Sequence, residues 1–566
     1  AVQGRPSLRS RSLARRGSRV VTAGRGMCRG RGSGTSATSM LDAVIEHARE
    51  RAGMLAVDGR VHRSPERFED DYTLESTKLG DGFSGAVVAA RCKATGAKCA
   101  VKTFRMHSWT DERRRHVMNE IDINLCMDHP HVVRMSAVYV SQETVRIVLE
   151  RMDGGELFTR LLNEYRFSEA DASHSSRQML LALNYLHKQG VCHRDIKMEN
   201  FLYSHEGGSW LKLIDFGFAT FFNEEDHMAE RLGTVRYVAP EVLVQDYTGG
   251  TCDMWSLGVI VYALLIGNLP FDRHSTSATA EAIMAGAYDT RCGPWGGVST
   301  QGREFVHQLL TVDPLARPTA EQALNHPFVR ERYRNIEATH RLDRYVGAAF
   351  GCFAQGSPFK QACLQIVASS LTTDERFELE VAFAEFEKSH TGMISPDELQ
   401  NLVQDNVEAQ EFVAVMKQQG RQLRCSDFVA AMVAVRPRHF ESSIRAAFRR
   451  FDLGSRDVTS STISHCGDAA CDMRPSRSEW SVDMEHVSLS MTEDDLVKFL
   501  CAGRGPQAEL QAPPRVGSSL SASPPSPRTA KKGLRASPWA VGTLAFLADF
   551  LVGMCGPSML PTGGLR

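Results

Sequence analysis

The spacing of apolar residues changes along the chain, and the changes predict where one kind of structure gives way to another. Residues 72 to about 125 contain short β-branched runs, AVVAA and CAVKTF, followed by a charged helix. From there to residue 329 the apolar runs lengthen, as in SLGVIVYALLIG, and turn signals separate them. The pattern predicts a small strand-rich part followed by a mostly helical part, together spanning residues 72–329.

Two further helical segments follow. Residues 330–371 are first basic and then amphipathic, with Phe359, Cys363, Ile366 and Val367 recurring at helical spacing. Helix–loop–helix patterns then repeat within residues 372–465. We interpret the first segment as a junction and the second as a separate all-α region.

The two ends of the chain differ from its middle. Residues 1–41 contain nine Arg and no Asp or Glu, which is typical of a basic disordered tail or a targeting peptide. Residues 466–538 form a low-complexity linker rich in Ser and Pro. Residues 539–566 form a hydrophobic tail whose apolar run is shorter than the about 20 residues that span a bilayer, so we expect at most membrane tethering there.

Composition narrows the class of protein. A chain of 566 residues has room for about three or four domains. Its formal net charge of −1 and its 42% hydrophobic content predict globular domains and no nucleic-acid partner. Its 14 Cys form no CxxC pair, which favours thiols in a reducing compartment, and we therefore expect a cytoplasmic protein.

Glycines suited to binding phosphate open the strand-rich part. In LGDGFSGAV, the spacing of Gly80, Gly82 and Gly85 lets a strand–turn–strand lie close over phosphates, with backbone N–H groups facing them. A strand rather than a helix follows at Val87, which distinguishes the motif from a dinucleotide-binding fingerprint.

Charged residues with the chemistry of phosphoryl transfer follow in order. Lys102, in AVK, can pair with nucleotide phosphates, and Glu120 on the following helix is a candidate ion-pair partner for it. In HRDIKMEN, Asp195 can accept a hydroxyl proton and Lys197 can neutralise the moving phosphoryl group.

Two residues have the chemistry of metal ligands. Asn200, at the end of HRDIKMEN, can hold a metal ion, and Asp215 in IDFG supplies a carboxylate for Mg²⁺.

Together with VAPE and DPLARP further along, the order of these motifs resembles the protein-kinase family over residues 72–329. The resemblance implies an α+β bilobal protein-kinase fold, with a small β-rich N-lobe, a helical C-lobe, and ATP and Mg²⁺ between them. It assigns Mg²⁺ to Asn200 and Asp215, and structural roles to Glu241, Asp253 and Arg317. The ATP-binding residues that it implies are Leu79, Gly80, Gly82, Gly85, Val87, Ala100, Lys102, Leu149, Glu150, Met152 and Glu156.

Substrate preference is also suggested by the resemblance. Lys197, two places after the expected base, is similar to Ser/Thr kinases rather than tyrosine kinases. Glu156 and Glu199 resemble the acidic pair that binds an Arg upstream of the acceptor, so we expect basic-context protein substrates. The alternative is that both are ordinary surface carboxylates.

Arg194 normally pairs with a phosphate on the activation loop. Here that loop is acidic, and carboxylates can replace a phosphate opposite Arg. We therefore expect activation without loop phosphorylation, and we expect Thr234 to contact the catalytic Asp. The carboxylates are those of Glu224, Glu225, Asp226 and Glu230.

The region after the kinase resembles that of calcium-dependent protein kinases of plants and protists. FKQACLQIVASSLTTDE, leading into AFAEFEKSHTGMISPDEL, carries the likeness. The resemblance implies a contact between the junction and an EF-hand region, in which the junction blocks the kinase until calcium closes the EF-hands upon it. The C-lobe would then be followed by an all-α EF-hand-like region.

The first EF-hand loop keeps only some of its ligands. Its candidate Ca²⁺ ligands are Glu387, Ser389, Thr391 and Glu398, with Gly392 at the central turn. Only two of these are carboxylates, and calcium affinity follows the charge of the ligands. Two hypotheses remain: a weak calcium sensor, or a fixed clamp or docking surface that does not use calcium.

A second loop, from Met416 to Asp427, has Met and Gln where ligands belong and Arg421 where a Gly is needed. Calcium binding is not expected there. Leu423 nevertheless matches Ile394, the apolar position through which paired loops bridge, so the paired fold is expected to persist.

The end of the chain carries a different likeness. GPSMLPT resembles the nucleophile motif of signal-peptidase-like serine proteases, with Ser558 as nucleophile, but no Lys base follows it. The tail is therefore either a membrane tether or the product of a gene-model fusion. For the whole chain, the alternative to an enzyme is a kinase-fold scaffold or docking protein with a calcium-independent EF-hand-like region.

Overall fold

A computed structural model describes the two predicted lobes and the helical region after them. Among the described residues, no helix combines the length and apolar character needed to cross a bilayer. The linker expected at 466–538, apart from three residues, and the tail at 539–566 lie outside the described part. The described residues are 37–53, 57, 60–63, 67–82, 85–106, 109–223, 227–230, 232–291, 293–331, 343–403, 406–445, 447, 497, 498 and 500.

The N-lobe is built on a six-stranded sheet in the order β1-β5-β6-β4-β3-β2. Its pairs are antiparallel except β1, which runs parallel to β5 and adds a strand before the predicted start of the domain. The bounds are β1 (Val61–Arg63), β2 (Tyr72–Gly82), β3 (Gly85–Cys92), β4 (Lys98–Arg105), β5 (Met135–Val140) and β6 (Thr144–Glu150), with α3 (Phe68–Asp71) before β2.

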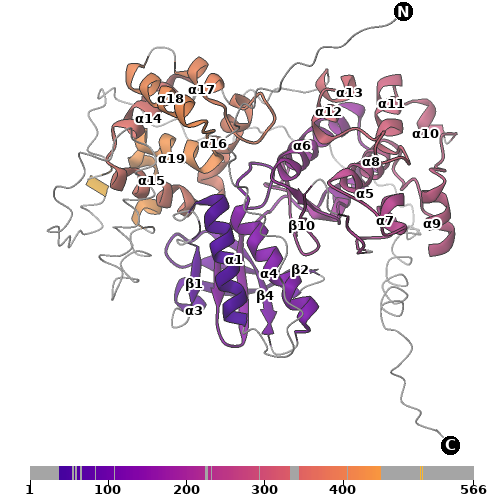
Figure 1. Cartoon of the computed structure of the whole chain (residues 1–566), viewed down its shortest axis with the longest axis horizontal. Helices are drawn as coiled ribbons and strands as arrows, with labels where there is room; N and C mark the ends of the chain where they lie inside the picture. Colours follow the sequence, from indigo (N-terminus) through magenta and orange to yellow (C-terminus); the bar gives the residue numbers. More distant parts are fainter. Residues whose placement is uncertain are drawn as a thin grey trace, which may run out of the picture. The chain divides into compact units, whose positions relative to one another are not determined.

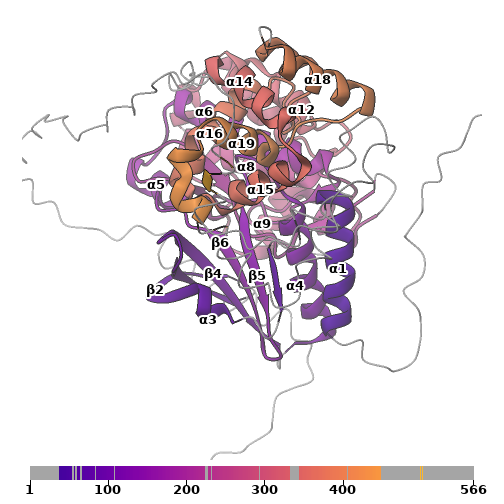
Figure 2. The same ribbon diagram turned by 90° about the vertical axis from the view of Figure 1, so that its left-hand side faces the viewer.

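Two helices cover one face of this sheet. The structure places α4 (Asp111–Cys126) and α1 (Ala37–Ala52) side by side, as both views show (Figures 1 and 2). Thr110 caps α4 by accepting a hydrogen bond from the backbone of Arg113. The tail expected at residues 1–41 is therefore wrong in its last residues, because α1 already begins at Ala37 and Leu41 is buried.

The C-lobe surrounds α8 (Thr251–Ile266), whose residues are almost all buried and which ends at Gly267 in the left-handed conformation (φ 91°). Short strand pairs hold the loops above it: β7 (Val191–Cys192) with β10 (Thr220–Phe221), and β8 (Phe201–Tyr203) with β9 (Leu211–Leu213). The other helices are α5 (Leu157–Glu164), α6 (Glu169–Lys188), η2 (Met198–Asn200), α7 (Pro240–Leu243), α9 (Thr276–Met284), α10 (Gly293–Gly296), α11 (Thr300–Leu309), α12 (Ala320–Leu324) and α13 (Pro327–Arg330).

Behind the kinase lobes, six α-helices and a 3₁₀ helix share one apolar core. Ile394 and Leu423 exchange both backbone hydrogen bonds, at 2.9 and 2.8 Å, so the predicted bridge between paired loops is confirmed. The elements are α14 (Asp343–Gln355), α15 (Pro358–Ser370), α16 (Thr373–Phe386), α17 (Pro396–Leu402), α18 (Val407–Gln419), α19 (Cys425–Val435) and η3 (Pro437–Phe440).

The described part of the junction belongs to this helical core. Phe350 and Phe353 of α14, and Leu364 and Val367 of α15, are buried against α18 and α19. Between Asp343 and Ser370, the junction thus packs with the EF-hand-like region.

Buried ion pairs join this region to the kinase lobes. The Lys212 amine, 1% exposed, lies 2.8 Å from Glu150 of β6 and 2.7 Å from Glu380 of α16. Arg376 pairs with Glu380 at 2.7 Å and reaches Asp128 at 3.4 Å. Because unpaired buried charges are costly, these residues hold the two surfaces in one register.

Buried neutral histidines make stability depend on pH. Burial lowers the pKa of His129 to about 3 and that of His390 to about 4, with smaller contributions from Lys212 and Arg177 respectively. Unfolded His binds a proton below about pH 6.5, whereas these folded residues do not. Their stabilising contribution is therefore complete above about pH 6.5 and is lost as pH falls toward the folded pKa values. We expect the thermal unfolding midpoint to fall between pH 7.5 and pH 5.

A variant series checks this assignment. His129→Asn keeps an acceptor for the His131 backbone N–H. This variant should reduce the slope of the free energy of unfolding against pH by up to about 1.4 kcal/mol per pH unit. His227→Asn is the control, because His227 is 70% exposed. Equal slopes in all three proteins would contradict the prediction.

Candidate active site

Strand register brings the expected nucleotide-facing side chains to one face of the sheet. Lys102 lies opposite Val87 on β3 and Ile147 on β6, and Ala100 lies opposite Leu149. Since residues two apart on a strand share a face, these residues project together toward the cleft. The side chain of Glu150 instead turns to Lys212, so only its backbone is left for a nucleotide.

The glycine-rich turn is closed by pairing of β2 with β3, where Gly82 lies opposite Gly85 and Gly80 opposite Val87. Gly85 has a φ of 155°, and a Cβ there would lie 2.7 Å from the Thr103 carbonyl oxygen. Only glycine fits this position. Leu79 precedes the turn, and its side chain is exposed.

Lys102 sits between two carboxylates. Its amine lies 2.5 Å from Glu120 on α4 and 2.8 Å from Asp215 after β9, and Lys102 is only 3% exposed. Although burial alone would lower the pKa of Lys102, both carboxylates raise it above its ordinary value. Lys102 in turn holds the pKa of Asp215 below its usual range against the effect of burial. The amine is thus a fixed positive charge.

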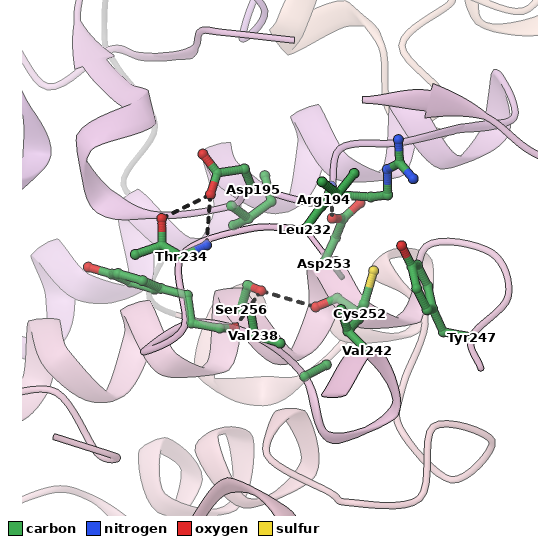
Figure 3. A pocket seen from close by; sticks show the side chains of 13 residues that line it. Arg194, Asp195, Leu232, Thr234, Val238, Val242, Tyr247, Cys252, Asp253 and Ser256 are labelled. Atoms are coloured by element: carbon green, nitrogen blue, oxygen red, sulfur yellow. Dashed lines mark hydrogen bonds between the residues drawn. The ribbon is translucent and has the colours of Figure 1, made fainter. Parts of the chain in front are cut away.

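The loop after β7 carries the expected catalytic groups. Lys197 donates to Asp195 at 2.6 Å, and Asn200 donates to the Asp195 carbonyl at 2.8 Å. Thr234 donates to the other Asp195 carboxylate oxygen from its hydroxyl at 3.0 Å, which confirms the contact expected for it (Figure 3). Asp195 is therefore held by groups from both sides of the loop.

Asp253 fixes the backbone of this loop. It accepts hydrogen bonds from the N–H groups of His193 and Arg194, each at 2.9 Å, and from His187. Burial would raise the pKa of Asp253, but these donors hold it below its ordinary value. Arg194 and Asp215 have φ values of 65° and 62°, and such strain costs about 1–3 kcal/mol at each residue. The Asp253 bonds sustain the strained Arg194.

The expected C-lobe ion pair is present. Arg317 donates to both carboxylate oxygens of Glu241, at 2.6 and 3.0 Å, and also to the carbonyl of Thr251. This bidentate geometry is the strong form of an Arg–carboxylate pair. It ties the end of the activation segment to α8.

Arg194 meets a carboxylate of the activation segment. Its guanidinium donates to Glu230 at 2.8 Å and to the carbonyl of Phe218 at 2.7 Å. Of the acidic residues expected there, Glu224, Glu225 and Asp226 lie outside the described residues. Glu230 thus places a carboxylate against the Arg194 guanidinium.

Two carboxyl groups of the C-lobe, those of Glu156 and Glu199, interact electrostatically. Glu156 is the N-cap residue of α5, and Glu199 belongs to η2. Burial raises the pKa of both carboxyls, and Glu156 raises that of Glu199 further. One Glu199 oxygen is buried without a hydrogen-bond partner in the described part of the chain. Two carboxyl groups in this arrangement are suited to bind a cation.

The residues present fit ATP and Mg²⁺. Lys102 is a fixed charge for phosphates. Asn200 and Asp215 supply oxygen ligands, the kind that Mg²⁺ prefers. Met152 lies half-buried just after β6.

Comparisons with known proteins agree with this geometry. A family model described as protein kinase domain matches residues 73–329. Calcium-dependent protein kinase 9 of Oryza sativa subsp. japonica is 33% identical over 410 residues, covering 70% of this chain and 70% of that protein. The chain belongs to the calcium-dependent protein kinase family.

Other relatives show the same range of similarity. Calcium-dependent protein kinase 3 of Plasmodium yoelii yoelii is 30% identical over 408 residues, covering 70% of this chain and 75% of that protein. Calcium-dependent protein kinase 34 of Arabidopsis thaliana is 32% identical over 403 residues, covering 69% and 76%. The chain is a serine/threonine protein kinase, and the kinases of this family use ATP and Mg²⁺.

In this kinase the loop expected to be the first EF-hand provides hydrogen-bond donors to its own carboxylates. Glu398 accepts from the backbone N–H groups of Lys388 and Ser389, and from Ser395 in a capping box at the start of α17. Glu387 accepts from the Ser389 hydroxyl at 2.9 Å and from the Thr391 N–H at 2.7 Å. With two carboxylates already engaged, this donor set is a poor fit for Ca²⁺.

The same loop contacts the kinase C-lobe. The His390 carbonyl accepts a hydrogen bond from Asn184 on α6. A Cβ at Gly392 would lie 2.4 Å from the Tyr185 ring, and Gly392 also has a φ of 79°. The central glycine of the loop is thus required both by the turn and by close approach to α6.

Sequence reasoning missed two groups of residues. The Lys212–Glu380 pair joins positions far apart in the chain, and no local pattern signals it. Helix α1 does have a signal, because Leu41, Ile45, Ala48 and Ala52 recur at helical spacing.

Replacing Glu230 tests whether its carboxylate substitutes for a phosphate. We expect Glu230→Gln to lower kcat about threefold to tenfold, because Arg194 loses a charged partner that is 57% exposed and hence partly screened. The measurement is steady-state peptide phosphorylation. Glu206→Gln, in an exposed turn, is the control. Strong activation of the wild-type enzyme by phosphorylation of Thr220 would contradict the prediction.

Proposed function

We propose that this kinase phosphorylates Ser or Thr in proteins with Arg upstream of the acceptor, and that its EF-hand-like region holds the kinase lobes without needing calcium. The observation that carries the catalytic part is the meeting of Lys102 with both Glu120 and Asp215. In protein kinases this ion pair must be in place for transfer.

We infer the catalytic roles from the chemistry of these groups and from their hydrogen bonds. Asp195 accepts the hydroxyl proton of the acceptor, and Lys197, 2.6 Å away, neutralises charge on the phosphoryl group. Asn200 and Asp215 would hold Mg²⁺, which would neutralise charge on the nucleotide phosphates. Lys102 orients those phosphates, and Glu120 keeps Lys102 in position.

Glu156 and Glu199 support the preference for Arg. Burial raises the pKa of both carboxyls, the charge of Glu156 raises that of Glu199 further, and a guanidinium beside them would stabilise their ionised forms. An ordinary surface carboxylate would not have a buried oxygen without a partner, as Glu199 has within the described residues. The substrate side chain would supply the missing donors.

The proposal that the EF-hand-like region holds the kinase lobes without calcium rests on buried polar contacts between them. Glu150 at the end of β6 shares Lys212 with Glu380, and Arg134 donates to the carbonyls of Ser369 and Leu371 at 2.6 and 3.0 Å. None of these bonds uses a calcium ligand. The region is therefore built to stay docked in the absence of the ion.

We also propose a cytoplasmic location. No disulfide links the cysteines of the described residues, in keeping with a reducing compartment. The tail that would tether the protein to a membrane lies outside the described residues.

Asp195→Asn distinguishes the enzyme from a kinase-fold scaffold. We expect the change to lower transfer from ATP to an Arg-x-x-Ser peptide by at least about a hundredfold, because Asn cannot accept the hydroxyl proton. Peptide phosphorylation by the full chain measures it. Ala in place of the peptide Arg should raise KM, and should do so less in Glu199→Gln. No transfer by the wild-type protein would favour the scaffold.

Calcium titration tests the clamp. We expect the full-chain wild-type enzyme to phosphorylate the peptide at rates within about twofold with a chelator and with micromolar calcium, because the loop offers too little charge. Ser389→Asp/Thr391→Asp, which adds two carboxylates at ligand positions, should gain calcium binding in calorimetry. A wild-type rate that rises more than about fivefold with calcium would contradict the clamp and restore the sensor.

Two variants on α16 test how the EF-hand-like region is held against the kinase lobes. Glu380→Gln removes a buried charge partner of Lys212 and Arg376 and should lower the unfolding midpoint and the rate. Glu378→Gln lies on the same helix but is exposed, so it should change neither.

A further inference from the structure

Helix α1 covers the face of α4 that looks away from the active site. Its buried residues Leu41, Ile45 and Ala48 share a core with Val117, Ile121 and Leu125, among others. In Figures 1 and 2 the two helices run side by side over the sheet. The apolar side of α4 is thus covered by the chain itself.

A polar contact fixes the register of the two helices. His47 Nδ1 lies 2.6 Å from the Asp122 carboxylate, and Asp122 is buried. Asp122 follows Glu120 by two positions, so the two carboxylates leave α4 on nearly opposite sides. Lys102 contacts α4 through Glu120, and His47 contacts the opposite side of α4 through Asp122.

Helix α1 also contacts β10, which follows Asp215 in the chain. The Arg51 guanidinium lies 4.3 Å from the centre of the Phe221 ring in β10 and donates to the Gln189 carbonyl at 3.0 Å. His47 meets the same ring edge-on, at 5.0 Å between centroids. Phe221 follows Asp215 by six residues, so α1 contacts α4, which carries Glu120, and β10, which follows Asp215 in the chain.

We propose that α1 is a built-in activating helix, in which His47 and Arg51 are positioning residues that hold α4 and β10 so that Glu120 and Asp215 meet Lys102. Neither residue touches the nucleotide or the acceptor. The inference rests on the phosphate transfer of this chain, so the wild-type rate is measured first and its absence is scored against the kinase activity alone.

The end of α1 also meets the EF-hand-like region. The Ala52 carbonyl accepts a hydrogen bond from Arg424 at the start of α19, and Arg424 pairs with Asp427 at 3.1 Å. Asp128, just after α4, accepts from the backbone of Ser426 at 2.9 Å. The helix is therefore held at the point where α19 approaches α4.

The test compares full-chain variants at a temperature where all remain folded by circular dichroism. His47→Ala removes the contact to Asp122 and should lower kcat about fivefold while KM for the peptide stays within about twofold. His47→Asn, which can place an amide N–H near the position of Nδ1, should recover at least half of the loss. Glu50→Ala, exposed on the same helix, is the control and should match the wild type.

Two measurements distinguish a positioning role of His47 from a purely structural one. Hydrogen exchange of residues 111–126 should increase in His47→Ala and not in Glu50→Ala. The double variant His47→Ala/Asp122→Ala should be no slower than Asp122→Ala alone, because both changes remove one contact. A kcat of His47→Ala within about 1.5-fold of the wild type, or an additive double variant, would overturn the proposal.

Discussion

The geometry of this kinase is organised around the buried ammonium group of Lys102. Lys102 is 3% exposed, and a charge at that depth is stable only beside opposite charges. One of them comes from a helix and the other from a strained turn after β9, so movement of either element away from Lys102 removes one of the two carboxylates beside the amine. The bonds of Asp253 to the catalytic loop, and the packing behind α4, serve the same geometry.

How much could be predicted from the sequence depends on how local each signal is. Gly85, Lys102, Asp195 and Asp215 lie in short motifs whose chemistry and neighbouring turns are readable in one stretch, and the structure joins Lys102 to Asp215 by a hydrogen bond of 2.8 Å. The two-lobed kinase fold follows from their order. The contact of Thr234 with Asp195 was predicted as well, because the resemblance carried it.

Residues that depend on distant partners were not predictable in this way. The second half of α4 is buried almost all round, because the sheet and α1 both cover it, so its own sequence shows no clear apolar stripe. The partner of Glu150 is Lys212 on a separate strand, and Lys212 in turn needs Glu380. In the loop expected to be the first EF-hand, ligand counting showed which carboxylates were missing, but not that Glu398 would accept from the backbone of Lys388 and join Ser395 in the capping box of α17.

Strand β1 has a practical consequence for anyone who shortens this protein. It is the edge strand of the sheet beside β5, and together with α1 it lies before residue 73, where the kinase-domain match begins. A fragment cut at that boundary would leave β5 with unpaired backbone groups and α4 with an uncovered apolar side. Unprotected strand edges and apolar patches drive self-association. Low solubility of such a fragment would report the loss of this N-terminal wrapping rather than any defect of the catalytic lobes.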